Sequence, residues 1–224
     1  MDSKTARKIT VVLVDDHQVV REGLRSLLEV ESDLSVIGDA GDGLSAIRLV
    51  ERLKPDVVLL DLIIPGLNGQ EVARRVRKCS PKTRVIVLSM HSSEPYVIEA
   101  LRHGAAGYVL KDASYTDLVR AIREVMAGWR YLSPPLSKVA IDAYQEKANA
   151  ATTDRYDMLT AREREVLQLA AEGHSNNEIA NRLEISPRTA ETHRANLMRK
   201  LRLRTHTDLI KYAIERRIVA VGNC

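Results

Sequence analysis

Five charged or polar residues stand at the ends of apolar, β-type runs in the first half of the 224-residue sequence. They are Asp15, Asp16, Asp61, Ser89 and Lys111. Three carboxylates held close together repel one another unless a cation joins them, and oxygen ligands with room for water favour Mg²⁺. A carboxylate beside Mg²⁺ and a lysine can attack a phosphoryl group, because both cations neutralise charge on its oxygens. These residue types therefore predict an aspartyl phosphorylation site, with the hydroxyl of Ser89 hydrogen-bonded to the resulting phosphate.

The elements that must position these residues are predicted by apolar runs that alternate with helical patterns. The expected strands span residues 9–15, 34–40, 56–60, 84–89 and 107–111. The expected helices span residues 17–30, 44–53, 69–78, 95–104 and 115–128. Five strands alternating with five helices predict an α/β domain whose parallel sheet is covered on both faces. Ligands bind at the carboxyl ends of such strands, although each polar residue taken singly could instead be a solvated loop residue or a helix cap.

The remainder of the chain has a different organisation. Residues 131–157 begin with Pro134-Pro135 and end in small polar residues, which indicates a linker containing a short helix. Beyond the linker we find helix signals and no strand signal. The start signals are the capping boxes Thr160–Glu163 and Ser175–Glu178 and the pair Ser186-Pro187. With a fourth helix expected over about residues 207–217, the last segment is predicted to be a separate all-α domain of four helices.

Two of these helices, separated by the turn at residues 183–186, indicate a helix-turn-helix. If Ala190 and Leu197 face inward, the helical period of about 100° per residue places a polar face opposite them. That face carries Arg188, Thr192, Ala195 and Arg199, flanked by Glu191 and Asn196. A helix face with small side chains and arginines fits the major groove of double-stranded DNA, where basic side chains mostly bind phosphates.

The distribution of charge and apolar residues agrees with this division. Residues 158–224 hold 12 basic and 8 acidic residues, whereas residues 1–130 hold 19 and 18. The basic excess indicates an anionic partner for the last segment, although a solvated helical face could carry the same charges. Because the chain has neither an apolar run of about 20 residues nor an apolar signal-peptide core, we expect a cytoplasmic protein without a membrane partner. Cys79 and Cys224 lack metal-ligand spacing and are expected to be reduced thiols.

The array of Asp15-Asp16, Asp61, Ser89 and Lys111 resembles the receiver domain of two-component response regulators. The strings VDDHQVVREGLRSLL, LLDLIIPGLNG and VLSMHSSEPYVIEALRHGAAGYVLKDAS are similar to those of the NarL/FixJ subfamily. This resemblance implies a flavodoxin-like, doubly wound, five-stranded receiver domain over residues 8–130, followed by the linker at residues 131–157.

The resemblance also implies roles for individual residues. Asp61 would be the phospho-acceptor, Lys111 would bind the phosphate, and Ser89 would be the switch hydroxyl. The Mg²⁺ ligands would be Asp15, Asp16, Asp61 and the backbone carbonyl of Ile63. Tyr108 matches an aromatic residue whose rotamer follows phosphorylation, and we expect it to be a switch residue, with a half-buried strand tyrosine as the alternative.

Residues 158–224 resemble the LuxR-type helix-turn-helix, through the string LTAREREVLQLAAEGHSNNEIANRLEISPRTAETHRANLMRKL. By this resemblance, the base contacts are Glu191, Thr192 and Ala195. The phosphate contacts are Arg188, Arg194, Arg199 and Lys200. Two positions have open alternatives, because Glu191 could accept from a cytosine or only solvate the helix, and His193 could pack inward or contact DNA. The last helix could pack on its own domain, form a dimer seam, or do both.

The function implied is that of a non-enzymatic response regulator. A sensor histidine kinase would phosphorylate Asp61, and phosphorylation would control homodimerisation and binding to promoter or operator DNA, and so transcription. An aspartyl phosphatase would need a second acid two residues after Asp61, where the chain has Ile63. A nucleotide-binding enzyme would need a glycine-rich turn after the first strand. A constitutive DNA binder, whose receiver serves only for dimerisation, is a further alternative.

Overall fold

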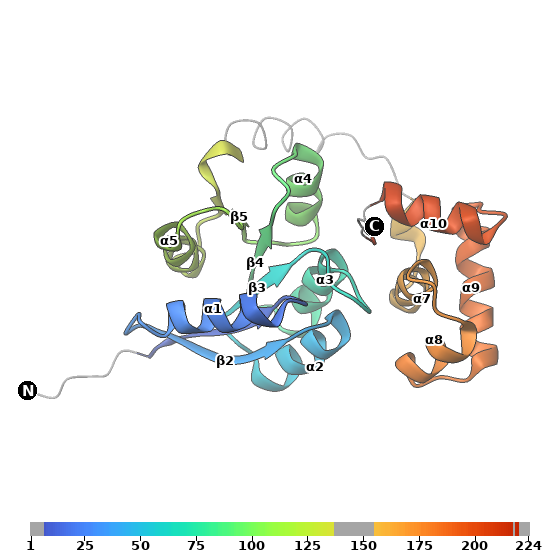
Figure 1. Ribbon diagram of the computed structural model, residues 1–224, viewed down its shortest axis with the longest axis horizontal. Coiled ribbons are helices and arrows are strands. Elements are labelled where there is room, and N and C mark those ends of the chain that lie inside the picture. The colour runs from blue at the N-terminus through green and yellow to red at the C-terminus, as the bar shows by residue number, and fades with distance from the viewer. Residues whose placement is uncertain (1–6, 137–154, 217, 220–224) are drawn as a thin grey trace, which may run out of the picture. The chain divides into compact units, whose positions relative to one another are not determined.

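The computed structural model describes residues 7–136, 155–216 and 218–219. The chain forms two compact units, one built mainly from residues 1–150 and the other mainly from residues 151–224. Each is a separate body and is described by itself (Figure 1). The short helix expected within the linker and the second cysteine, Cys224, lie outside the described residues.

The first unit is a parallel sheet with helices on both faces (Figure 1). Its strands are β1 (Ile9–Val14), β2 (Leu34–Ala40), β3 (Val57–Asp61), β4 (Arg84–Ser89), β5 (Gly107–Leu110) and β6 (Tyr131–Leu132). Its helices are α1 (Gln18–Leu28), α2 (Gly43–Leu53), α3 (Gly69–Cys79), α4 (Glu94–Arg102) and α5 (Tyr115–Met126), followed by the 3₁₀ helix η1 (Pro134–Leu136). The strands lie in the order β2-β1-β3-β4-β5-β6, so β2 lies on one side of β1 and all later strands lie on the other side. The predicted doubly wound α/β fold is therefore confirmed, with its switch point at the carboxyl ends of β1 and β3.

The sheet has one strand more than the five we predicted. The additional strand, β6, lies within the segment at residues 131–157 that was expected to be linker, and it pairs in parallel with β5. The amide of Tyr131 donates to the carbonyl of Ala106 at 3.2 Å, and the amide of Ser133 donates to the carbonyl of Tyr108 at 3.0 Å. A strand of two residues next to Pro134 is too short to give a periodic signal, which explains why the sequence pattern missed it.

Both faces of the sheet are packed with apolar side chains, so the central strands must be apolar throughout. On one face Leu59 and Ile86 pack in a cluster with Ile122 of α5. On the other face Val87 and Tyr108 pack with Val97 of α4. All five residues of β3 are buried. This packing fixes the backbone that carries Asp61.

The turn after β3 brings α3 against that same backbone. Gly66 has φ 78°, a left-handed conformation that glycine adopts without strain. The amide of Gly69 donates to the carbonyl of Leu62 at 2.9 Å. A Cβ atom on Gly69 would stand 2.3 Å from the carbonyl oxygen of Asp61, a distance that real contacts do not show. Only glycine permits this approach, and the contact holds Asp61 at the rim of the sheet.

The second unit contains helices and, among its described residues, no strand. Its elements are η2 (Arg155–Met158), α7 (Ala161–Ala171), α8 (Asn176–Leu183), α9 (Pro187–Leu201) and α10 (His206–Glu215). Both predicted capping boxes are present, and Thr205 with Asp208 forms a third at the start of α10. Ser186 caps α9 by accepting from the amide of Thr189 at 3.1 Å. The four predicted helices are confirmed, and none of the described helices is long and apolar enough to cross a membrane.

Candidate phosphorylation site and nucleic-acid interface

A lysine ammonium joins two carboxylates at the carboxyl edge of the sheet. Lys111 follows β5, and its Nζ donates to Asp15 Oδ2 at 2.7 Å and to Asp61 Oδ2 at 2.6 Å. Asp15 follows β1 and Asp61 ends β3, so the contact joins residues 96 and 50 positions apart in the sequence. Parallel strands bring their carboxyl ends to one edge, and the structure places these three residues together as the spacing predicts.

Asp61 is a buried carboxylate whose two oxygens are held differently. The residue is 8% exposed, and its Oδ1 accepts from the backbone amide of Ile63 at 3.2 Å. Burial raises the pKa of Asp61 above its ordinary value, although the hydrogen bond and the charge of Lys111 act in the opposite direction. Burial lowers the pKa of Lys111, but hydrogen bonds to Asp15 and Asp61 outweigh it, so that pKa is raised. The lysine therefore stays charged.

The acidic pair after β1 has a partner that the sequence reasoning missed. The Nδ1 of His17 lies 2.8 Å from Asp16 Oδ1 and 3.2 Å from Asp15 Oδ1. The amide of His17 also donates to Asp15 Oδ1 at 2.9 Å. Asp15 is 2% exposed, whereas Asp16 and His17 are exposed. The signal was available in the sequence, because His17 directly follows Asp15-Asp16 and begins the first helix.

The donors in this group fit a small, oxygen-preferring cation. Ligand atoms of Asp15, Asp16 and His17 all lie within 4.8 Å of one another. Asp15 and Asp16 would hold such a cation, because Mg²⁺ prefers carboxylate oxygens. The carbonyl of Ile63 stays a prediction, since the contact seen at Ile63 is made by its amide.

The hydroxyl expected to bind phosphate is linked to the loop before α4. Ser89 is 1% exposed, and its Oγ accepts from the amide of His91 at 3.1 Å. The hydroxyl of Tyr108 donates to the carbonyl of the same His91 at 2.7 Å. The ring of His91 stacks on Tyr96 of α4 at 4.2 Å between centroids. Tyr108 is a residue of β5 and is fully buried, not half-buried as the structural alternative assumed, and its switch role stays a prediction.

The predicted DNA-facing side of α9 is exposed. Ala190 and Leu197 are buried in the helical domain, as the wheel requires. On the opposite face the exposed residues are Arg188, Glu191, Thr192, Ala195 and Arg199. Thr192 Oγ1 donates to the carbonyl of Arg188 at 2.9 Å, and Arg199 donates to the side chain of Asn196 at 3.0 Å. Both arginines therefore lie along the outer surface of this helix.

Two further predicted phosphate contacts have partners within the helical domain. Arg194 donates to Asn176 Oδ1 at 3.2 Å and to His206 Nδ1 at 2.9 Å, so it links α9 to α8 and α10. Lys200 Nζ contacts Glu163 Oε2 at 2.6 Å, and the same carboxylate belongs to the capping box of α7. His193 is half-buried. Arg194 and Lys200 thus join helices, and their contacts with DNA stay predictions.

Fold and sites together define a phosphorylation-type receiver domain joined to a helix-turn-helix domain. Comparison with protein families agrees: residues 11–123 match the response regulator receiver domain, and residues 157–213 match the bacterial regulatory proteins of the luxR family. The nitrate/nitrite response regulator NarL of Escherichia coli (strain K12) is 39% identical over 210 residues, which cover 93% of this chain and 96% of NarL. The oxygen regulatory protein NreC of Staphylococcus aureus (strain JH9) is 37% identical over 213 residues, covering 93% and 98%.

Solved structures give the same result. RcsB of Salmonella typhimurium matches with a TM-score of 0.56 and 27% identity, covering 92% of this chain and 98% of that one. An RcsB–DNA complex matches with a TM-score of 0.57, and a structure of two RcsB dimers bound to two parallel DNAs matches with 0.56, at 27% and 26% identity and the same coverage. The chain belongs to the two-component response regulators of the NarL/FixJ subfamily, with a receiver domain and a LuxR-type DNA-binding domain.

The raised pKa of Asp61 predicts how pH affects stability. The native state keeps a proton on Asp61 to higher pH than the unfolded chain does, so the native state loses stability as pH rises between the ordinary and the raised pKa. In EDTA, Asp61→Asn is therefore expected to raise the free energy of unfolding of the receiver domain at pH 7. The gain should shrink as pH falls from the raised pKa toward the ordinary one and should be absent below about 4, where Asp61 is protonated in both states, as measured by urea titration followed through the single tryptophan, Trp129.

Asp112→Asn is the control, because it removes an exposed carboxylate beside Lys111. It should change the free energy of unfolding by less than about 0.5 kcal/mol. Equal or lower stability of Asp61→Asn at pH 7 would contradict the account of the buried carboxylate.

The different contacts of Arg199 and Arg194 predict different mutant behaviour. Arg199→Ala should weaken binding to a short duplex and reduce the slope of log affinity against log salt by about 0.9, because it removes one phosphate contact. Thermal unfolding should not change.

Arg194→Ala should lower the stability of the helical domain by about 1 kcal/mol, because it removes the link between three helices. Fluorescence anisotropy and calorimetry measure the two effects, and normal unfolding of Arg194→Ala would refute its structural role.

Proposed function

We propose that a sensor histidine kinase phosphorylates Asp61, and that the phosphoryl group controls dimerisation and DNA binding, and through them transcription. The observation that carries this proposal is the contact of Lys111 with both Asp15 and Asp61 in a buried setting. A lysine so placed reaches the acceptor carboxylate and the adjoining acidic pair at once. A solvated loop carboxylate would have neither contact.

In the proposed phosphoryl transfer, one of the two carboxylate oxygens of Asp61 is the attacking atom. This oxygen attacks phosphorus, the O–P bond forms, and the N–P bond to the kinase phosphohistidine breaks; because the other ring nitrogen of that phosphohistidine carries a proton, a neutral imidazole leaves. Mg²⁺ held by Asp15, Asp16 and Asp61 would neutralise charge on the phosphoryl oxygens. The ammonium of Lys111 favours the carboxylate form of Asp61 before the attack, and afterwards it pairs with the phosphoryl oxygens. The amide of Ile63 orients the carboxyl group throughout.

The response begins at Ser89, whose oxygen accepts a hydrogen bond but whose own proton goes to no partner among the described residues. A phosphoryl group on Asp61 brings strong acceptors for that proton. When Ser89 turns toward the phosphate, its bond to the amide of His91 weakens. Tyr108 holds the carbonyl of His91, so the loop, Tyr108 and the start of α4 respond together. This coupling provides a two-state element at the α4–β5 side of the receiver domain.

The output is binding of α9 in the major groove. Arg188 and Arg199 would bind phosphates, while Glu191, Thr192 and Ala195 would contact base edges. The similar protein RcsB binds DNA as dimers in one of the matched structures, which supports a homodimer as the form that binds an operator with two half-sites. Arg194 and Lys200 would support this face by joining the helices, with phosphate contacts as a second role.

Binding of DNA with and without a phosphoryl mimic tests the proposal. With Mg²⁺ and beryllofluoride, the full chain is expected to bind its operator, obtained by selection from random duplexes, at least about fivefold more tightly than without them. Asp61→Asn should show no increase, whereas Asp112→Asn should respond as the wild type does. Analytical ultracentrifugation in the same buffers measures dimerisation.

Each contrary outcome points to a specific alternative. Equal affinity with and without beryllofluoride would indicate a constitutive DNA binder. Catalytic turnover of a small phosphoester that persists in Asp61→Asn would indicate an enzyme and overturn the assignment of the acceptor.

A further inference from the structure

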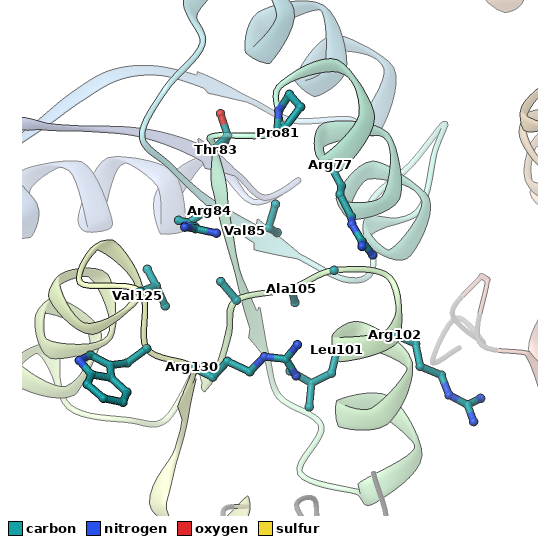
Figure 2. A pocket seen from close by; sticks show the side chains of 14 residues that line it. Arg77, Pro81, Thr83, Arg84, Val85, Leu101, Arg102, Ala105, Val125 and Arg130 are labelled. Carbon is teal, nitrogen blue, oxygen red and sulfur yellow. The ribbon is translucent and has the colours of Figure 1, made fainter. Parts of the chain in front are cut away.

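A cavity of about 350 Å³ lies at the amino-terminal edge of β4 and β5, the edge opposite to Asp61 and Lys111 (Figure 2). Four segments form it: the end of α3, the turn and start of β4, the end of α4 with the loop to β5, and the end of α5 with the residues that follow it. Its floor includes Val85 and Ala105, which are buried. The volume lies within the range of small-ligand sites. The contacts of the phosphorylation site do not extend to it.

The lining of this cavity is strongly basic. Four arginines line it, and no acidic residue does: Arg77, Arg84, Arg102 and Arg130. Arg102 contacts Glu99 at 3.3 Å, and Figure 2 shows its side chain pointing away from the others. Within the described part of the chain, the side chains of Arg77 and Arg84 make no hydrogen bond or ion pair. Both side chains are exposed, and together they give this cavity a positive potential that attracts an anion.

Helix dipoles explain only part of this arrangement. Arg77 lies in the last turn of α3 and Arg102 in the last turn of α4, where positive side chains are favourable. Arg84, however, is the first residue of a strand and has no helix end to complement. The stem of Arg77 also packs over Gly104, where an added Cβ would stand 2.9 Å from the arginine Cδ. Gly104 has φ +100°, so this backbone leaves room for the arginine to reach the cavity.

An aromatic side chain completes the rim. Trp129 is 71% exposed and lines the same cavity. It follows Gly128, whose φ of +93° turns the chain out of α5. An exposed indole next to guanidinium groups offers a flat surface for a planar ring, while the guanidinium groups offer paired donors for phosphate oxygens.

We propose that this pocket binds a nucleotide, with the phosphate groups on Arg77 and Arg84 and the base against Trp129. A cavity of about 350 Å³ has the size of a small-ligand site, whereas a nucleic acid strand needs a groove that runs past several nucleotides. The site is made by the receiver domain alone and does not depend on phosphorylation of Asp61. It gives this domain a second input on the edge opposite to the phosphorylation site.

The single tryptophan of the chain reports binding directly. ADP and GDP are titrated into the full-length protein without Mg²⁺, and quenching of Trp129 fluorescence is recorded. Saturable quenching is expected for at least one of them. Arg77→Gln and Arg84→Gln, made separately, should each weaken binding at least about tenfold, because each removes charge-assisted hydrogen bonds. Arg48→Gln is the matched control, since it removes an exposed arginine of α2 and should leave the affinity unchanged.

Calorimetry with Trp129→Leu tests the contact with the base, and weaker binding of ADP is expected. Inorganic pyrophosphate should bind more weakly than ADP to the wild type. The proposal is overturned if neither nucleotide quenches Trp129, if Arg48→Gln weakens binding as much as the pocket variants do, or if pyrophosphate binds as tightly as ADP. Displacement of ADP by a short DNA duplex at lower concentration would likewise refute it, because nucleic acid would then be the occupant.

Discussion

The contact of one ammonium group with two buried carboxylates is the interaction on which the receiver site depends. Lys111 reaches Asp15 and Asp61 across the switch point of the sheet, and neither acid could be buried there as an anion without a compensating charge. The lysine does not remove the cost completely, since burial still raises the pKa of Asp61. The carboxylate is thus held in place and kept in a high-energy environment. In the proposed reaction, a phosphoryl group on Asp61 would place its charge on oxygens that Lys111 and a bound cation can neutralise.

The rest of the receiver domain can be understood as support for this contact. A fully apolar β3 fixes the backbone at Asp61, and Gly69 allows α3 to pack directly on it. The loop after β4 is held at His91 by Ser89 and Tyr108, so a change at Asp61 has a short route to α4. The helical domain is held together by its own polar links, including those of Arg194 and Lys200. The exposed α9 face is therefore carried by a helix that is hydrogen-bonded to its neighbours.

Strand ends and helix starts could be predicted because their signals are local. Apolar runs that end at Asp61, Ser89 and Lys111 predicted where three strands end and which polar residues stand there. The capping boxes predicted where the helices begin. The missed features depend on tertiary contacts. β6 exists only because β5 offers backbone partners, and Arg194 is a structural residue only because His206 of α10 lies beside it. Neither contact produces a periodic pattern of residues in the sequence. The basic cavity could not be predicted either, because its lining residues come from four separate segments.

The central claim is that the carboxylate held by Lys111 receives the phosphoryl group. The most direct measurement is to treat the wild-type protein with acetyl phosphate and Mg²⁺ and to reduce it with borohydride, which converts an acyl phosphate to an alcohol. Mass spectrometry of the peptides then locates the altered residue. The account predicts the alteration at Asp61, lost when Mg²⁺ is chelated. An alteration at Asp15 or Asp16, or none at Asp61 under conditions in which a known receiver domain is modified, would contradict it.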